Sequence, residues 1–443
     1  MNGNGHPDGP ILVCFLQPPE QHANLLTSPQ TITKLRSLIN DACSNKEFDL
    51  PCASVMVVGK EDRSATELFF HSTGGINEGH YNGSEIYWLA SCTKLVTGIA
   101  CMRLVERGTL DLDNADQIER FCPELKDIKV LGEDGILVEK TERITLRMLL
   151  THTAGFGYSF LNKKLKEYAQ NCNSNRLEYD EFSGQMQDFL QPLLNQPGER
   201  FEYGISVDWA GLLVERAIGV KLNDYIQGHI FEPLNVKDMS MVPSKEMKER
   251  LQGLWQRDEH GRLNSREYPL NRPLSEGQIC DNTMINSGGS GLFGSVKGFG
   301  KILMALLCDG TSLSTGHEIL SPSTVSEMFT NQIPHMPNFG RKPLPAIKPD
   351  LVYLAAELYP LALSKPQGWG LTFMLSPGVT GRSSATAHWS GLSNVFWWCD
   401  RDKGIAGVVG SQILPFVDPK AAGLWAEVEG LVYEGLQQAY TER

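Results

Sequence analysis

Residues 87–100 read YWLASCTKLVTGIA and hold the one Ser-x-x-Lys of this 443-residue chain, at Ser91 and Lys94. Apolar side chains recur after Ser91 at spacings of three and four residues, a pattern that predicts a helix. Ser91 would then lie at the helix start, with Lys94 one turn on and on the same face. A serine hydroxyl needs a base to become a good nucleophile, and a lysine can be that base only when burial lowers its pKa. The first amides of the helix can stabilise negative charge on a carbonyl oxygen, so the pair suggests nucleophilic catalysis.

The pair alone is weak evidence, because a chain of this length is expected to hold about one or two such matches by chance. Two other segments strengthen the case. Tyr203 precedes an apolar helix pattern, and a buried tyrosine near a lysine can relay a proton to and from Ser91, although a core aromatic is the alternative interpretation. Residues 388–391 read as a strand beside a turn, where small residues let a backbone N–H approach a bound carbonyl.

The composition indicates a soluble globular protein, with 41% hydrophobic and 21% charged residues. The net charge is −12 without a long basic run, which argues against nucleic-acid binding. The longest apolar stretches are too short to cross a membrane. Residues 1–10 are polar and rich in Gly and Pro, unlike a signal peptide. We therefore expect a cytoplasmic protein that binds neither nucleic acid nor membrane.

The ten cysteines show no Cys-x-x-Cys spacing, which gives little support to a zinc site or a redox pair. Free buried thiols in a reducing compartment are the favoured interpretation. Cys92, beside Ser91, is interpreted as a small helix residue facing the core, with a reactive thiol as the alternative. We expect no metal and no cofactor.

Apolar patterns predict strands toward both ends of the chain and helices between them. The predicted strands are residues 53–59, 67–71, 368–373, 385–389, 393–399 and 404–410, and the predicted outer helices are residues 29–47 and 419–440. This order indicates an α/β (α+β) fold, in which both termini build one sheet and a helical region is inserted. We expect a flexible segment over residues 1–20, a sheet region over 21–90 and 296–443, and a mainly helical region over 91–295, with the active site in the cleft between the two regions.

A glycine cluster over residues 287–294 contains a formal Gly-x-Gly-x-x-Gly at Gly289, Gly291 and Gly294. A dinucleotide-binding interpretation needs a buried strand before the first glycine, but residues 280–286 are largely polar and no βαβ pattern surrounds them. The favoured interpretation is a tight turn that leads into a helix.

These segments together resemble the serine β-lactamase and penicillin-binding-protein superfamily, on the branch that holds class C β-lactamases, D,D-peptidases and related esterases. The resemblance covers roughly residues 30–440, with the elements in family order. They are Ser91-x-x-Lys94, residues 108–113 (GTLDLD), residues 149–155 (LLTHTAG), Tyr203, the glycine cluster and residues 389–391 (WSG). The resemblance implies the β-lactamase-like fold, whose antiparallel sheet is flanked by helices.

The resemblance also implies roles for individual residues. Ser91 would be the acylated nucleophile, and Lys94 and Tyr203 would be the general base and acid pair. The N–H groups of Ser91 and Leu392 would form the oxyanion hole.

Two departures from the family pattern bear on the substrate. Ile205 stands where the family has an asparagine that bonds the substrate's acyl side chain, so we expect an apolar acyl pocket. Trp389-Ser390-Gly391 replaces Lys-Thr-Gly, so the cation that binds a carboxylate is missing unless His388 takes its place. Penicillin hydrolysis and peptidoglycan chemistry are therefore disfavoured, and Trp389 is expected to pack against a hydrophobic ester or alcohol.

Within the superfamily, the chain is most similar to the fungal lovastatin-type transesterases. These enzymes share the tryptophan in place of the lysine and a Tyr-Gly…Asp-Trp-Ala-Gly run like that of residues 203–211. The resemblance implies acyl transfer from a thioester or ester, through acyl-Ser91, to a hydroxyl of a small hydrophobic natural product in secondary metabolism. The implied partners are a small acyl donor, an alcohol acceptor and an acyl-carrier domain of a polyketide synthase. A β-lactamase-like esterase is the first alternative, and a non-catalytic binding protein with the same fold is the second.

Overall fold

The computed structural model describes residues 29–61, 64–74, 81–172, 178–275, 284–312, 314–355, 357 and 359–441. The flexible segment expected over residues 1–20 lies outside this described part of the chain. None of the helices described there is both long and apolar enough to cross a membrane.

A seven-stranded sheet joins the two ends of the chain, and each strand in it runs antiparallel to its neighbours. Its order is β10 (Gly368–Trp369), β11 (Met374–Leu375), β12 (Ala387–Gly391), β13 (Val395–Asp400), β14 (Ile405–Gly410), β1 (Cys52–Glu61) and β2 (Ser64–Gly74). The late strand β14 pairs with the early strand β1, with Val55 opposite Val409. This arrangement confirms the prediction of an antiparallel sheet built from both termini.

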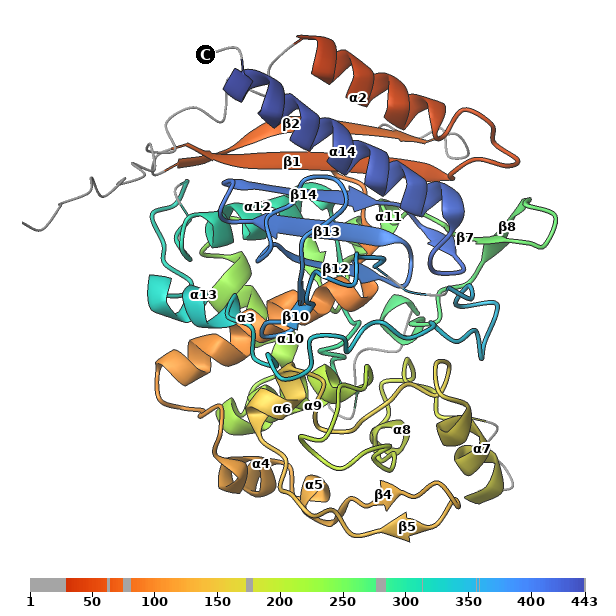
Figure 1. The fold of residues 1–443 in the computed structure, drawn as a ribbon, viewed down its shortest axis with the longest axis vertical. Coiled ribbons are helices and arrows are strands. Elements are labelled where there is room, and N and C mark those ends of the chain that lie inside the picture. Colours follow the sequence, from red (N-terminus) through yellow and green to blue (C-terminus); the bar gives the residue numbers. More distant parts are fainter. Residues whose placement is uncertain are drawn as a thin grey trace, which may run out of the picture.

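Helices cover both faces of the sheet (Figure 1). Successive side chains of a strand point to opposite faces. On β13, Phe396 stacks on Trp425 of α14 (Pro419–Thr441), with ring centroids 4.9 Å apart, while Trp397 contacts Phe299 of α12 (Val296–Leu307) at 6.1 Å. Because both faces are covered, every residue of β13 and β14 is buried. The N-terminal α2 (Pro29–Asp41) packs beside α14 and against β2.

The remaining helices lie mostly on one side of the sheet, where they form the lower half of Figure 1. At their centre is α3 (Thr93–Glu106), whose first ten residues are all buried, as expected for a helix surrounded by protein. It packs against α9 (Ser206–Ile218). The others are α4 (Ala115–Phe121), α5 (Glu124–Asp127), α6 (Leu146–Leu150), α7 (Lys163–Cys172), α8 (Met186–Phe189), α10 (Leu222–Ile226), α11 (Lys245–Glu249) and α13 (Pro322–Met328). The residue boundaries expected for the two regions stay predictions.

Short strands form three further small sheets. One small sheet has the order β3 (Tyr87–Trp88), β9 (Phe293–Gly294) and β6 (Met239–Ser240), and another has β15 (Ile413–Leu414), β7 (Leu254–Arg257) and β8 (Leu263–Arg266). A third pairs β4 (Val130–Leu131) with β5 (Leu137–Val138).

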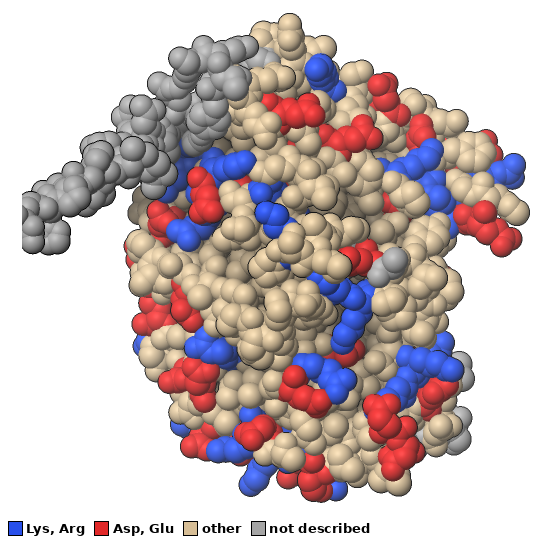
Figure 2. Space-filling view, in the orientation of Figure 1, with Lys and Arg blue, Asp and Glu red and all other residues tan. Residues whose placement is uncertain are grey.

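Figure 2 shows basic and acidic side chains interspersed over one face of the molecule, without a broad basic surface on that face.

Candidate active site

Ser91 lies on a sharp turn between β3 and α3. The predicted helix begins here as a 3₁₀ turn, Ala90–Cys92, and continues as α3 from Thr93. Ala90 has a φ of +44°, a left-handed conformation that is uncommon for a residue with a side chain. The Thr93 hydroxyl donates to Ala90 O at 2.6 Å and accepts from Leu292 N at 3.0 Å, which holds the turn. Ser91 is thereby left partly exposed, with its side chain at a cavity.

Lys94 is fully buried one turn after Ser91, and its ammonium group has three acceptors. Nζ donates to Ser91 Oγ at 3.1 Å, to the Tyr158 hydroxyl at 3.1 Å and to Gly289 O at 2.9 Å. These partners match the three N–H donors of a lysine. The Ser-x-x-Lys spacing therefore brings the two side chains into direct contact, as the sequence predicts.

The glycine cluster supplies one of these acceptors. Gly289 N–H donates to Asp208 Oδ1 at 3.0 Å, and a Cβ at Gly289 would lie 2.2 Å from Asp208 Oδ2. Only glycine lets this turn approach the carboxylate so closely. The turn interpretation agrees with this geometry, and the turn directs the Gly289 carbonyl toward Lys94.

Two tyrosines flank Lys94. The ring of Tyr203 lies 4.8 Å from Lys94 Nζ, but its hydroxyl accepts a hydrogen bond from Trp389 Nε1 at 3.0 Å. The hydroxyl that bonds the ammonium group is that of Tyr158, 5.4 Å from Tyr203 between ring centroids. Burial raises the pKa of Tyr158 well above its usual value, so its hydroxyl stays protonated.

Sequence reasoning missed Tyr158. The signal that could have found it is its position three residues after the family-like LLTHTAG segment of residues 149–155. That segment carries no chemistry of its own that can be derived from residue types. Its end nevertheless directs the following residues toward Lys94.

The end of β12 lies against the nucleophile turn. A Cβ at Gly391 would lie 2.4 Å from Leu89 O, so only glycine permits this backbone contact. Leu392 follows the strand and lines the same cavity as Ser91. Its N–H has no acceptor among the described residues. An amide in this position can donate to an oxyanion formed at Ser91.

A cavity of about 290 Å³ opens beside Ser91 and has mainly aromatic and aliphatic walls. Its polar lining comes from a few side chains, among them Ser390, Glu202 and Lys342. The Ser390 hydroxyl is bonded to the Tyr359 hydroxyl at 2.7 Å. The apolar lining is contributed by Phe160, Leu161, Phe182, Phe201, Phe339, Pro343, Leu344, Pro345, Val352, Met374, Trp389, Leu392 and Phe416.

Two residues expected to contact substrate lie behind the cavity wall. His388 is fully buried, with Nε2 2.7 Å from Ser376 Oγ and its ring 4.6 Å from that of Tyr359. Because strand side chains alternate, Trp389 faces the cavity and His388 faces away from it. Burial lowers the pKa of His388 well below its usual value, so it does not replace the missing cation. Ile205 is likewise fully buried, at the start of α9.

No cluster of three or more His, Cys, Asp or Glu side chains suited to a metal ion occurs in the described ranges. Cys92 is buried, and burial raises the pKa of its thiol well above the usual range. Its Sγ donates to Val395 O at 3.7 Å. The core interpretation of Cys92 therefore agrees with the structure, and the reactive-thiol alternative does not.

Residues 42–430 of the chain match the family described as Beta-lactamase. The chain is 32% identical over 364 residues to monacolin J acid methylbutanoyltransferase of Aspergillus terreus. The aligned region covers 79% of this chain and 82% of the relative. It is 31% identical over 348 residues to lovastatin esterase of Penicillium rubens, covering 75% of this chain and 81% of the relative.

Solved structures agree with these matches. Unliganded simvastatin synthase from Aspergillus terreus superimposes with a TM-score of 0.73 and 26% sequence identity, covering 92% of this chain and 99% of that one. The likeness extends over both the sheet and the helical half.

Proposed function

The chain belongs to the beta-lactamase family, and on this premise we propose that it is a serine acyltransferase. It moves an acyl group from a thioester or ester donor, through acyl-Ser91, to a hydroxyl of a small hydrophobic natural product in secondary metabolism. The contact that carries this proposal is the 3.1 Å hydrogen bond between Lys94 Nζ and Ser91 Oγ at the wall of an apolar cavity.

In the first half-reaction, Ser91 Oγ attacks the carbonyl carbon of the donor. Lys94 takes the serine proton across their 3.1 Å contact once its ammonium group, which donates to Ser91 Oγ in the structure, has lost a proton. The carbonyl oxygen becomes negative and accepts hydrogen bonds from the N–H groups of Ser91 and Leu392. When the intermediate collapses, the carbon–sulfur or carbon–oxygen bond breaks. The leaving thiolate or alkoxide takes the proton from Lys94.

The second half-reaction repeats these steps with the acceptor alcohol as nucleophile. Its proton passes to the Lys94 group, the acyl–Ser91 bond breaks, and Ser91 Oγ regains a proton. Tyr158 supports this transfer because its hydroxyl contacts Lys94 Nζ. Tyr203, whose ring lies against Lys94, presents a hydroxyl bonded to Trp389 at the cavity, where it can guide the alcohol.

The apolar cavity also favours transfer over hydrolysis. Water competes with the alcohol for the acyl-enzyme, so transfer needs a bound acceptor and exclusion of water. Aromatic walls such as Trp389 and Phe201 bind a hydrophobic acceptor better than water. The same walls offer no buried cation to a β-lactam carboxylate at Trp389-Ser390-Gly391.

We infer that the thioester is presented by an acyl-carrier domain of a polyketide synthase, an inference supported by the likeness to lovastatin-type acyltransferases. The basic residues of α7 give it little support, since Lys163 pairs with Glu167 at 3.4 Å and Lys164 with Glu133 at 3.0 Å. A kcat/KM for a carrier-bound acyl group well above that for the same group on N-acetylcysteamine would support the inference, and equal values would contradict it.

The test of the main proposal is intact-protein mass spectrometry after mixing with a short-chain acyl thioester of N-acetylcysteamine. We expect an acyl adduct on the wild type and none on Ser91→Ala. A chase with hydrophobic alcohols should discharge the adduct faster than water does. Absence of an adduct with thioesters, simple esters and β-lactams would instead indicate the non-catalytic binding protein.

Ester hydrolysis is the second candidate function. The observation that favours it is the 31% identity to a lovastatin esterase, over 75% of this chain. The same chase separates the two functions, because an esterase loses its adduct equally fast with and without the alcohol.

A further inference from the structure

A three-residue loop, Leu392 to Asn394, joins β12 to β13 and carries the amide proposed to bind the oxyanion. Asn394 has a φ of +62°, a left-handed conformation that asparagine tolerates better than most residues. Its backbone N–H donates to Gly391 O at 2.9 Å and closes the loop. Leu392 therefore lies within a turn whose shape depends on Asn394.

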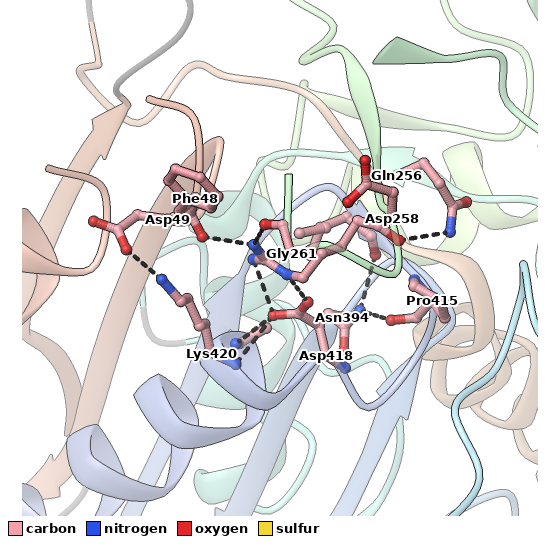
Figure 3. A network of polar contacts seen from close by, with 12 residues as sticks. Phe48, Asp49, Gln256, Asp258, Gly261, Asn394, Pro415, Asp418 and Lys420 are labelled. Atoms are coloured by element: carbon pink, nitrogen blue, oxygen red, sulfur yellow. Dashed lines mark hydrogen bonds and ion pairs between the residues drawn. The ribbon is translucent and has the colours of Figure 1, made fainter. Parts of the chain in front are cut away.

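The Asn394 side chain is fully buried, and its amide group is bonded on both sides. Nδ2 donates to Ile413 O at 2.8 Å and to Pro415 O at 3.0 Å, while Oδ1 accepts from Asp418 N at 3.2 Å (Figure 3). Asn394 Nδ2 thus donates two hydrogen bonds, and Oδ1 accepts one. Few other side chains satisfy this pattern, because the residue must donate twice, accept once and adopt positive φ.

A buried ion pair fixes the segment that holds Asn394. Arg257 of β7 donates through Nε to Asp418 Oδ2 at 2.5 Å, and its Nη1 donates to Phe48 O at 2.6 Å and Gly261 O at 2.9 Å (Figure 3). Asp418 Oδ1 caps α14, accepting from the N–H groups of Lys420 and Ala421, each at 3.1 Å. Segments far apart in the sequence therefore converge behind the loop.

The same loop is tied to the strand before the nucleophile. Ser393 Oγ donates to Trp88 O at 2.6 Å, and Gln412 Nε2 donates to the same oxygen at 3.2 Å. Trp88 is three residues before Ser91. The loop and the nucleophile turn are thus held in one buried hydrogen-bond network.

We propose that Asn394 is a positioning residue that sets the Leu392 N–H toward the oxyanion, with Arg257 and Asp418 holding Asn394 in place. This inference rests on the proposed function, in which Leu392 N–H stabilises the oxyanion. An oxyanion donor is effective only where its direction is fixed before the reaction. The loop is short, and its backbone is left-handed at Asn394. The hydrogen bonds of the Asn394 side chain therefore set the direction of the Leu392 N–H, two residues earlier.

The test compares Asn394→Gly with the wild type. Glycine keeps the left-handed backbone and removes the three side-chain hydrogen bonds, so it isolates the network from the φ angle. We measure the single-turnover acylation rate, the KM for the donor, and the Ki of a trifluoromethyl ketone whose carbonyl becomes an oxyanion on addition of Ser91. Rates are normalised to folded enzyme by circular dichroism.

For Asn394→Gly we expect the acylation rate to fall roughly 10- to 100-fold and the ketone Ki to rise by a similar factor. KM should stay within about twofold, because the aromatic walls of the cavity lie outside the loop. Asn394→Asp should behave likewise, since a carboxylate would face the carbonyls of Ile413 and Pro415. Ser393→Ala removes only the hydrogen bond from Ser393 Oγ to Trp88 O. If the Asn394 variants do not fold, the same measurements are made on Ser393→Ala.

The matched control is Tyr433→Phe. It also removes a buried hydrogen bond between α14 and β13, from the Tyr433 hydroxyl to Asp400 Oδ2 at 3.0 Å, but at the other end of β13. Its stability should fall while its rate and Ki stay unchanged. Wild-type rate and Ki in the folded loop variants would overturn the inference. A wild type that neither acylates nor binds the ketone would overturn the proposed function itself.

Discussion

Two tyrosines contact Lys94, but their hydroxyl groups have different partners. Tyr158 bonds the ammonium group at 3.1 Å, and Tyr203 bonds Trp389 at 3.0 Å. If proton transfer runs through Lys94, each hydroxyl matters in its own way. The Tyr158 hydroxyl belongs to the buried hydrogen bonds of Lys94, and Tyr203 lies at the cavity that we propose holds the alcohol.

We expect Tyr158→Phe to slow acylation roughly 10²- to 10⁴-fold, since it removes a proton-bearing group on Lys94. It should also lower the free energy of unfolding by about 1–3 kcal/mol, because the buried ammonium loses an acceptor. Stopped-flow acylation and urea denaturation measure the two effects. Wild-type acylation by this variant would remove Tyr158 from the mechanism.

For Tyr203→Phe we also expect slow turnover, with the deacylation step by alcohol most affected. Its stability should change little, because Trp389 Nε1 then lies at a cavity that water can enter. To compare Tyr203→Phe with Tyr158→Phe, the rate of acylation and the rate of discharge by alcohol are measured separately for each variant. Equal loss in both steps would argue for one shared role of the two tyrosines.

Among the elements, β12 is the one whose position against the nucleophile turn matters most. Gly391→Ala would add a Cβ 2.4 Å from Leu89 O, and this neighbour is backbone that cannot rotate away. We expect β12 to shift and acylation to slow roughly 10- to 100-fold. The measurement is the single-turnover rate on folded protein.

Gly430→Ala is the control for that substitution. Gly430 lies in α14, where an added Cβ meets nothing within 4 Å. Alanine should therefore stabilise the helix by roughly 1 kcal/mol and leave the acylation rate unchanged. A similar loss of rate in both variants would show that the effect of Gly391 is not local.

For the protein as a whole, a buried carboxyl makes stability depend on pH. Glu181 accepts from Ser159 N at 2.5 Å and from Ser159 Oγ at 3.1 Å, next to Tyr158. Burial raises the pKa of Glu181 from 4.5 to about 7. Between these values the folded protein keeps the proton and the unfolded chain releases it, so stability falls as pH rises through this window.

The expected loss is roughly 3 kcal/mol between about pH 4.5 and 7, at about 1.4 kcal/mol per pKa unit. Glu181→Gln stays neutral at every pH and should remove this part of the slope. Urea denaturation at pH 5 and pH 8 tests this expectation. The free energy of unfolding of the variant should nearly equal that of the wild type at pH 5 and exceed it at pH 8. If the free energies of unfolding of variant and wild type differed by the same amount at both pH values, Glu181 would not be the source of this pH dependence.

Local sequence patterns were sufficient for most strands of the large sheet and for the contact between Ser91 and Lys94. They were wrong over residues 368–373, expected as one strand, where a turn separates β10 from β11, and over residues 29–47, where the helix ends at Asp41. Apolar patterns predicted the strands toward both ends and the helix after Ser91, because buried elements carry few polar side chains. In the structure, β13, β14 and the first ten residues of α3 are buried on every face. A spacing of three residues on one helix turn brings two side chains together wherever the helix lies. Family order then identified Tyr203 and Trp389, whose side chains both line the cavity.

The rest depended on how distant segments pack, and no local repeat encodes that. Tyr158 reaches Lys94 from 64 residues away, and His388 turns from the cavity because Trp389 faces it on an alternating strand. Asn394 reads as an ordinary turn residue, yet its side chain is bonded by segments that begin at Ile413 and Asp418. Such contacts form only when the sheet closes between the two ends of the chain, so residue type and spacing alone do not predict them.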